Sequence, residues 1–176
     1  AQVLKHVFDI SISHQTVINY INASASYLTG FVDENCPDPK GPCAADETYL
    51  KVEGYTRYTW LLLEQERRAI CGYNLSSTRG TEPALALINN CYGPPESPKC
   101  NTGELVTDGL PSYDSAVVAY NTAAIKASGE TVLTKRTVIG LQDLDPESEA
   151  YRVFKQLVER LNRTYKFHTR PRAGFK

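Results

Sequence analysis

Ser148-Glu149-Ala150-Tyr151-Arg152 lies just after a well-marked helix start in the last third of the chain. Asp145 is a good N-cap residue, and Pro146 suits the first helical position. Apolar residues then recur with a helical period at Ala150, Val153, Phe154, Leu157 and Leu161. Glu149 and Arg152 are therefore neighbours on one helix face, beside the apolar stripe.

Two interpretations of this acid and cation pair are open. Exposed pairs of this kind are common on helices, and each contributes roughly 0.3 to 0.5 kcal/mol without any function. A carboxylate and a guanidinium held together at the edge of a core can also be half of an active site. The spacing alone favours the simple ion pair. Other parts of the sequence are therefore needed to distinguish the two interpretations.

Two more helices are predicted upstream of this one. The first begins at Thr81 and has Pro83 inside its first turn, where proline is tolerated. The second opens at Leu110-Pro111-Ser112 and is stopped by Gly129. Residues 131–141 fit either a strand or a buried helix, because their branched side chains favour a strand while their spacing also fits a helix face.

The first half of the chain is rich in strand signals. Residues 4–12 alternate well enough for a strand, and from Thr16 the apolar spacing becomes helical. Residues 49–52, 58–63 and 68–73 are rich in aromatic and branched side chains, which predicts an antiparallel meander.

This order predicts one α+β domain over residues 1–176, with a mostly antiparallel sheet first and helices after it. The expected parts are a strand-rich segment (1–80), a helix-rich segment (81–168) and a basic tail (169–176). The formal net charge of -1 hides an excess of Lys and Arg after residue 155. Such a segment suits a phosphate-rich partner, although a solvated, charged helix explains it nearly as well.

Cysteines and sequons favour a secreted protein. Cys36 and Cys43 bracket one proline-rich loop, Cys91 and Cys100 bracket another, and both pairs are expected to form local disulfides. Cys71 lies in an apolar run and is expected to be a buried free thiol. Sequons occur at Asn22, Asn74 and Asn162, as in a secreted glycoprotein. No apolar run approaches the ~20 residues of a membrane-spanning helix.

The absence of Met and the start Ala1-Gln2-Val3 also fit a chain whose signal peptide has been removed. No cysteine has the paired spacing of a zinc site, and no histidine lies near enough in sequence to complete one. Neither a phosphate-binding glycine loop nor a nucleotide fingerprint is present in the sequence. We therefore expect no metal and no cofactor.

Five segments form an ordered pattern along the chain. They are Phe8-Asp9-Ile10-Ser11 with the helix after Thr16, Ala69-Ile70-Cys71-Gly72-Tyr73, Gly80-Thr81-Glu82-Pro83-Ala84-Leu85, Gly109-Leu110-Pro111-Ser112-Tyr113-Asp114-Ser115-Ala116, and Ile139-Gly140-Leu141-Gln142 with Ser148-Glu149-Ala150-Tyr151-Arg152. In this order they resemble the catalytic chain of the ribosome-inactivating proteins, toxins that act as rRNA N-glycosidases.

The resemblance implies a hydrolase that removes an adenine from a single-stranded loop of large-subunit rRNA and so blocks protein synthesis, as in plant defence. Glu149 would stabilise the positively charged sugar or polarise the attacking water, and Arg152 would contact the leaving base. Tyr73 and Tyr92 are the candidate rings for holding the base. The implied partners would be ribosomal RNA and the ribosomal proteins beside it.

A second class of function is open. A secreted, disulfide-stapled glycoprotein that binds a partner without chemistry, such as a defence or inhibitory protein, explains the composition and cysteines equally well. The two classes differ in whether Glu149, Arg152 and a tyrosine converge on one cleft.

Overall fold

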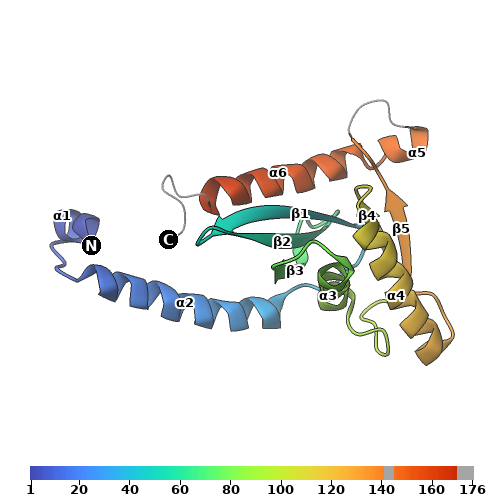
Figure 1. Ribbon diagram of the computed structural model, residues 1–176, viewed down its shortest axis with the longest axis horizontal. Helices are drawn as coiled ribbons and strands as arrows, with labels where there is room; N and C mark the ends of the chain where they lie inside the picture. The colour runs from blue at the N-terminus through green and yellow to red at the C-terminus, as the bar shows by residue number, and fades with distance from the viewer. Residues whose placement is uncertain (141–144, 170–176) are drawn as a thin grey trace. The chain divides into compact units, whose positions relative to one another are not determined.

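The computed structural model describes residues 1–140 and 145–169, and the chain divides into two compact units (Figure 1). The first unit is Ala1–Cys36 and the second is Pro37–Lys176. The five-stranded sheet and the helices that pack on it all belong to the second unit.

The first unit consists of two helices, α1 (Gln2–Phe8) and α2 (His14–Asn35). Ser13 caps α2 by accepting a hydrogen bond from the backbone N–H of Thr16 at 2.9 Å, and the predicted helix here is confirmed. The strand predicted over residues 4–12 is wrong. Leu4, Val7 and Phe8 are spaced three and four apart, which suits a helix as well as the alternation suits a strand.

The predicted antiparallel meander is confirmed in the second unit. It consists of β1 (Cys43–Val52), β2 (Tyr55–Glu64) and β3 (Ile70–Ser76), with β2 paired to both neighbours. Glu53-Gly54 joins β1 to β2 with φ angles of 52° and 82°, the backbone that a two-residue hairpin turn requires.

Two further strands extend the sheet beside β1. They are β4 (Gly103–Thr107) and β5 (Leu133–Thr137), and both run parallel to β1, giving the order β3-β2-β1-β4-β5. The ambiguous segment at residues 131–141 therefore contains a strand. The sequence analysis did not predict β4, which is only five residues long.

Two helices, α3 (Thr81–Tyr92) and α4 (Pro111–Ser128), pack on one face of the sheet. Pro111 begins α4, and Gly129 ends it in the left-handed conformation, as predicted. The core between these helices and the sheet is large and aromatic, and its fully buried members include Trp60, Leu62, Leu87, Tyr92, Tyr113 and Tyr120.

The other face is covered by α6 (Arg152–Thr169), which follows the short α5 (Pro146–Glu149) (Figure 1). Asp145 caps α5 by accepting hydrogen bonds from the backbone N–H groups of Glu147 and Ser148, which confirms the predicted start. The smaller core on this face contains Ala44, Leu63, Val106, Val138, Phe154 and Val158. Covering both faces of one mixed sheet with helices confirms the predicted α+β class.

Within the described part of the chain, no helix combines the length and the apolar composition needed to cross a membrane. Leu141 and Gln142, and the basic tail beyond Thr169, lie outside the described residues.

Candidate functional site

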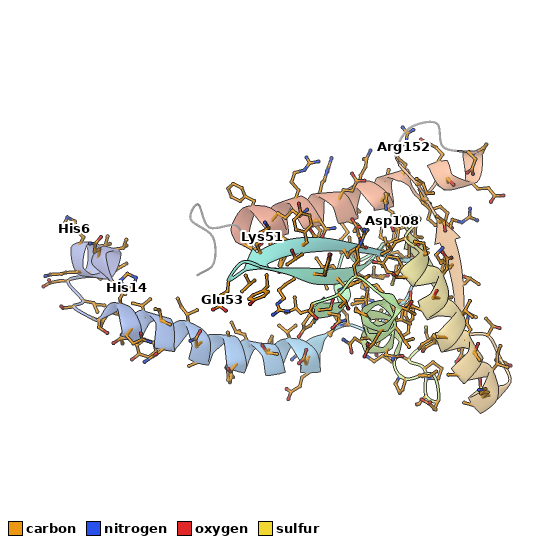
Figure 2. The ribbon with its side chains drawn as sticks, viewed as in Figure 1. His6, His14, Lys51, Glu53, Asp108 and Arg152 are labelled. Atoms are coloured by element: carbon orange, nitrogen blue, oxygen red, sulfur yellow. The ribbon has the colours of Figure 1, made fainter. Side chains whose placement is uncertain are left out.

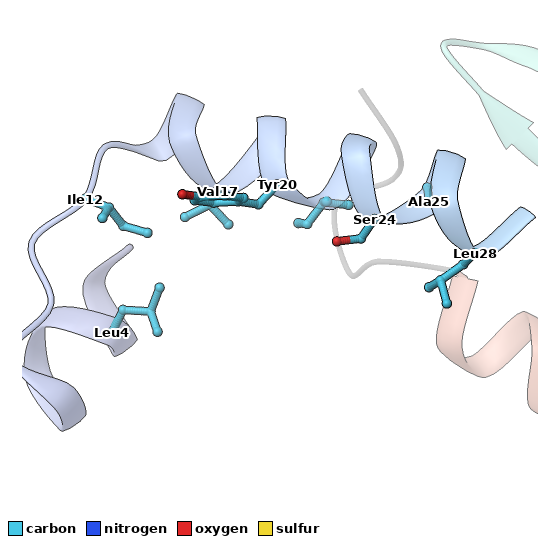
Figure 3. Close-up of a pocket in the computed structure, with 8 residues that line it drawn as sticks. Leu4, Ile12, Val17, Tyr20, Ser24, Ala25 and Leu28 are labelled. Carbon is cyan, nitrogen blue, oxygen red and sulfur yellow. The ribbon is translucent and has the colours of Figure 1, made fainter. Parts of the chain in front are cut away.

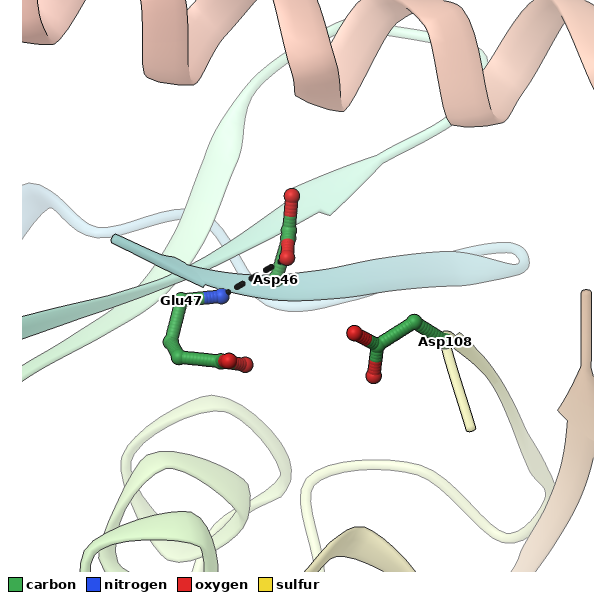
Figure 4. A group of neighbouring side chains, drawn as sticks. All are labelled: Asp46, Glu47 and Asp108. Carbon is green, nitrogen blue, oxygen red and sulfur yellow. Dashed lines mark hydrogen bonds between the residues drawn. The ribbon is translucent and has the colours of Figure 1, made fainter. Parts of the chain in front are cut away.

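Three carboxylates from two neighbouring strands meet at one end of the sheet (Figure 4). Asp46 and Glu47 are consecutive on β1, and Asp108 comes directly after β4. Strands β1 and β4 run parallel, so the residues that follow their paired segment lie side by side. One oxygen from each of the three acids lies within 4.8 Å of the others.

Asp46 is held in place at both of its carboxylate oxygens. Its Oδ1 accepts a hydrogen bond from the backbone N–H of Glu47 at 3.0 Å. Its Oδ2 accepts one from Nδ2 of Asn162 at 2.8 Å, and Asn162 lies on α6 with only 7% of its surface exposed. The hydrogen bond from Asn162 on α6 therefore fixes the orientation of the Asp46 carboxylate on β1.

The electrostatics of Asp46 show that negative charge is crowded here. Burial raises the pKa of Asp46 to about 6, the nearby Lys155 ammonium opposes this rise, and the charges of Glu47 and Asp108 add to it. Ionised Asp46 is thus destabilised in the protein alone. A bound cation would remove that cost.

Glu47 has different surroundings, although it is the next residue. Its Oε1 accepts a hydrogen bond from Nε of Arg79 at 2.6 Å, and its Oε2 accepts one from the Tyr113 hydroxyl at 3.3 Å. The Glu47 side chain is 5% exposed, so an arginine and a phenol take the place of water around it.

A polar groove of about 290 Å³ runs between this acid group and α6. Glu159, Asn162, Arg163 and Lys166 of α6 line it opposite Asp46. These positions are spaced three, four and seven residues apart, so they share one helix face. The groove thus combines a third carboxylate with two cations that can attract a phosphate backbone.

The donors of this site suit a hard divalent cation. Carboxylate oxygens are the ligands that Mg²⁺ and Mn²⁺ prefer. Asp46 and Asp108 supply them within the acid group, and Glu159 adds one in the groove that Asp46 also lines. The expectation that the chain holds no metal is therefore not supported by this site. The sequence analysis did not single out Asp46, Glu47 or Asp108. The available signal was a pair of acids directly after the apolar start of a strand, Cys43-Ala44-Ala45.

The structure places Glu149 and Arg152 elsewhere, where α5 gives way to α6 (Figure 2, Arg152). They form an ion pair with Arg152 Nη2 and Glu149 Oε2 3.1 Å apart, and their side chains are 37% and 49% exposed. Neither belongs to the acid group or lines the groove beside it.

The two candidate base-holding tyrosines are also not brought to Arg152 by any described contact. Tyr92 is fully buried in the core, and its hydroxyl donates to the backbone oxygen of Glu104 at 3.3 Å. Tyr73 is half-buried on β3, and its carbonyl accepts a hydrogen bond from Asn90.

Neither predicted disulfide is present, because Cys43, Cys91 and Cys100 are free thiols. Cys43 is fully buried beside Cys71 and Cys91. A contact with Cys71 lowers the pKa of Cys43, but a contact with Cys91 and burial outweigh it and raise that pKa to about 12. Cys43 is therefore a protonated core thiol, and Cys71 is buried as predicted.

Two of the three sequons are engaged inside the fold. Asn162 is buried and bound to Asp46, and Nδ2 of Asn74 donates to the backbone oxygen of Pro83 at 3.0 Å. A glycan at either nitrogen would break these bonds. Asn22 is exposed on α2, and its glycosylation stays a prediction, as does secretion.

The first unit carries a groove of its own (Figure 3). It has a volume of about 430 Å³ and is lined by apolar and small side chains of α2, with Leu4 and Ile12 beside them. Without a titratable acid or cation in its lining, it offers binding rather than chemistry.

A family model of the DDE domain, the one named for IS240 transposases, matches residues 42–169. The chain belongs to this family. The matched segment is most of the chain and contains all of β1, β4 and the described α6. No curated protein matches the chain.

Several solved structures are also similar to this chain. One is a chain of the simian T-cell lymphotropic virus intasome in complex with PP2A regulatory subunit B56 gamma, at 18% identity and a TM-score of 0.45. The alignment covers 71% of the present chain and 38% of that one, so the present chain spans well under half of its length. Another is the HTLV-2 integrase catalytic core domain in complex with magnesium, in its dimeric form, at 14% identity and a TM-score of 0.44. There the coverage is 76% and 77%.

Family membership corrects the functional interpretation of the sequence. The resemblance to ribosome-inactivating proteins is wrong, and so are the rRNA N-glycosidase activity, the toxin role and the ribosomal RNA partner that it implied. The secreted, disulfide-stapled binding protein is not supported either. The five segments that carried the resemblance are short, and their residue types are common at helix starts and strand ends.

Proposed function

We propose that this chain is the catalytic domain of a transposase or integrase that cuts and joins DNA strands with a divalent cation. Asp46 and Asp108 converge just beyond the paired segment of two parallel strands, inside a region that matches the DDE domain, and this convergence carries the proposal. The mixed sheet order favours the ribonuclease H-like fold of integrases.

The letters of the family name are those of two aspartates and a glutamate. Asp46 and Asp108 supply the first two, and Glu159 supplies the third from the α6 face of the groove. A divalent cation bound there would polarise a phosphoryl oxygen and lower the pKa of an attacking hydroxyl. The three carboxylates would hold it by charge and by oxygen donors.

The other residues of the groove have supporting roles. Asn162 fixes Oδ2 of Asp46, so the carboxylate keeps one orientation. Arg163 and Lys166 lie where they can pair with backbone phosphates of a DNA strand. Such phosphate contacts orient the strand without reading its sequence.

The reaction is a phosphoryl transfer without oxidation or reduction. An oxygen of water, or of a strand's terminal hydroxyl, forms a bond to phosphorus. The bond from phosphorus to a bridging oxygen of the attacked strand breaks, and the leaving oxygen takes up a proton. Water as the nucleophile cuts a strand, and a DNA hydroxyl as the nucleophile joins two strands.

Supercoiled plasmid DNA provides a direct test, because one cut converts it to a slower-migrating nicked circle. We expect the purified protein to nick the plasmid with Mg²⁺ or Mn²⁺ and not with EDTA. A labelled oligonucleotide with a free 3′ hydroxyl should also become joined to the plasmid.

Asp46→Asn is the matched variant for this assay, because it keeps the shape of the side chain and removes its charge. It should lose both nicking and joining. Nicking that persists in EDTA, or that is unchanged in Asp46→Asn, would overturn the proposed function.

A further inference from the structure

Asp46 and Glu47 extend to opposite sides of β1, as consecutive strand residues do (Figure 4). Asp46 points toward α6 and bonds Asn162 there. Glu47 points toward the helices on the other face, where Arg79 precedes α3 and Tyr113 lies in the first turn of α4. Two neighbouring acids therefore belong to two different layers of the fold.

Both carboxylate oxygens of Glu47 are already occupied. Arg79 forms an ion pair with Oε1, and the Tyr113 hydroxyl donates to Oε2. Burial and the nearby negative charge of Glu47 raise the pKa of Tyr113 well above its ordinary value, so the phenol keeps the proton that it donates. These bonds partly neutralise the Glu47 carboxylate and fix its orientation, which makes it a weaker ligand for a cation than Asp46.

Tyr113 also connects Glu47 to the segment that carries Asp108. It lies a few residues after Asp108, and its ring is fully buried against Trp60, with ring centroids 5.7 Å apart. Within that segment, Oδ1 of Asp108 accepts a hydrogen bond from the backbone N–H of Leu110 at 3.0 Å. The Glu47 to Tyr113 bond thus ties β1 to the turn that places Asp108.

We propose that Glu47 is a positioning residue, held out of the metal coordination by Arg79 and Tyr113, and that it sets the separation of Asp46 and Asp108. This inference rests on the proposed function, because it assigns roles within the same metal site. Within the acid group, Asp46 and Asp108 are then metal ligands, and Glu47 fixes their separation without binding the metal.

The proposal predicts that metal affinity and turnover separate on mutation. Glu47→Gln removes the charge and keeps the length, so Mn²⁺ affinity should stay within about threefold of the wild type. Turnover in the plasmid assay should fall about tenfold or more, as for other groups that orient metal ligands.

Arg79→Gln should behave differently from a simple loss of structure. It leaves the Glu47 charge uncompensated beside Asp46 and Asp108, so Mn²⁺ should bind more tightly while turnover falls. Arg79→Lys should recover part of the turnover, because the ammonium keeps the charge but offers a single point of contact.

The test is a titration of the metal-free proteins with Mn²⁺, followed by electron paramagnetic resonance, alongside plasmid nicking. Glu53→Gln and Arg57→Gln are the controls, because both residues are exposed on the β1 and β2 hairpin (Figure 2, Glu53). Tyr113→Phe is a second variant that removes only the hydroxyl, for use if Glu47→Gln does not fold. It should keep wild-type Mn²⁺ affinity and lose turnover.

The outcomes separate the two proposals. Loss of Mn²⁺ binding in Glu47→Gln as complete as in Asp46→Asn would make Glu47 a ligand and overturn this inference alone. Wild-type affinity together with wild-type turnover in Glu47→Gln and Tyr113→Phe would also overturn it. Failure of the wild type itself to bind Mn²⁺ would overturn the proposed function, and this inference with it.

Discussion

Two regions of this molecule place an acid beside a cation, and they differ in almost every physical respect. Glu149 and Arg152 are three residues apart, and both are well exposed. Asp46 is half-buried, with the positive charge of Lys155 on α6 acting on it and Asp108 as an acidic neighbour. The first pair arises from local chain geometry where α5 gives way to α6, whereas the second group requires the pairing of strands in the sheet.

The difference teaches which acids are costly to the fold. An exposed pair is solvated and screened, so it can form or break with little consequence. In the acid group, burial and then the charges of Glu47 and Asp108 raise the pKa of Asp46, which favours a bound cation. A buried negative charge whose free-energy cost the protein only partly offsets is typical of a functional site. An exposed ion pair carries no such cost.

The largest expected effect is loss of DNA cutting when a carboxylate of the site is neutralised. Asp108→Asn and Glu159→Gln should each reduce plasmid nicking by more than roughly 100-fold, since even residues that only orient metal ligands cost 10 to 100-fold. Glu149 lies ten residues before Glu159, in the same C-terminal part of the chain. Glu149→Gln is therefore the matched control. Equal activity of Glu159→Gln and Glu149→Gln would break the comparison.

A smaller effect is expected from the residue that orients Asp46. Asn162→Ala removes the 2.8 Å bond to Oδ2 of Asp46, so nicking should fall about 10 to 100-fold and the Mg²⁺ requirement should rise. Asn101, exposed in a loop, supplies the control Asn101→Ala. Unchanged Mg²⁺ dependence in Asn162→Ala would remove this residue from the account.

The Asp46 carboxylate should also limit stability in the absence of metal. Its pKa is raised from 3.8 to about 6 in the folded state, so the folded protein holds this proton more strongly than the unfolded chain. Stability from this group is therefore lost as pH rises from 4 to 6 and stays lower above that window. Asp46→Asn should be more stable at pH 7 by about 3 kcal/mol and should lack this pH dependence.

Urea unfolding of the metal-free proteins at several pH values measures this difference. The two proteins should converge near pH 4. A variant less stable than the wild type at pH 7 would contradict the assignment of strain to Asp46.

The smallest effect belongs to the exposed pair. Glu149→Gln should change the free energy of unfolding by no more than about 0.5 kcal/mol and leave nicking at the wild-type level. Thermal unfolding and the plasmid assay measure both. A loss of nicking comparable to that of Glu159→Gln would return Glu149 to the active site.

The parts of the fold that the sequence predicts are those set by local signals. The β1 to β3 meander, α2, α4 and the start at Asp145 follow from periodicity, turn residues and caps. The prediction of a strand where α1 lies is wrong because seven residues are too few to distinguish helical from alternating spacing. The strand β4 was not predicted because it is short and pairs only with strands far away in sequence.

The site could not be predicted by the same route. Asp46 and Asp108 come together only through the parallel pairing of β1 with β4, and Glu159 reaches the groove beside Asp46 only when α6 packs on the sheet. Glu149 and Arg152 drew attention because their relation is visible in five residues. The signals that deserved more weight were the two acids between Ala45 and Thr48, and the acid directly after the apolar pair Leu105-Val106 and Thr107.

Iron-mediated cleavage of the polypeptide tests the central claim most directly. Fe²⁺ bound in place of Mg²⁺, with ascorbate and hydrogen peroxide, generates radicals that cut the backbone beside the metal, and mass spectrometry locates the cuts. We predict cuts near Asp46, Asp108 and Glu159 that excess Mg²⁺ suppresses. Cuts confined to the neighbourhood of Glu149, or no cuts that Mg²⁺ suppresses, would contradict the account.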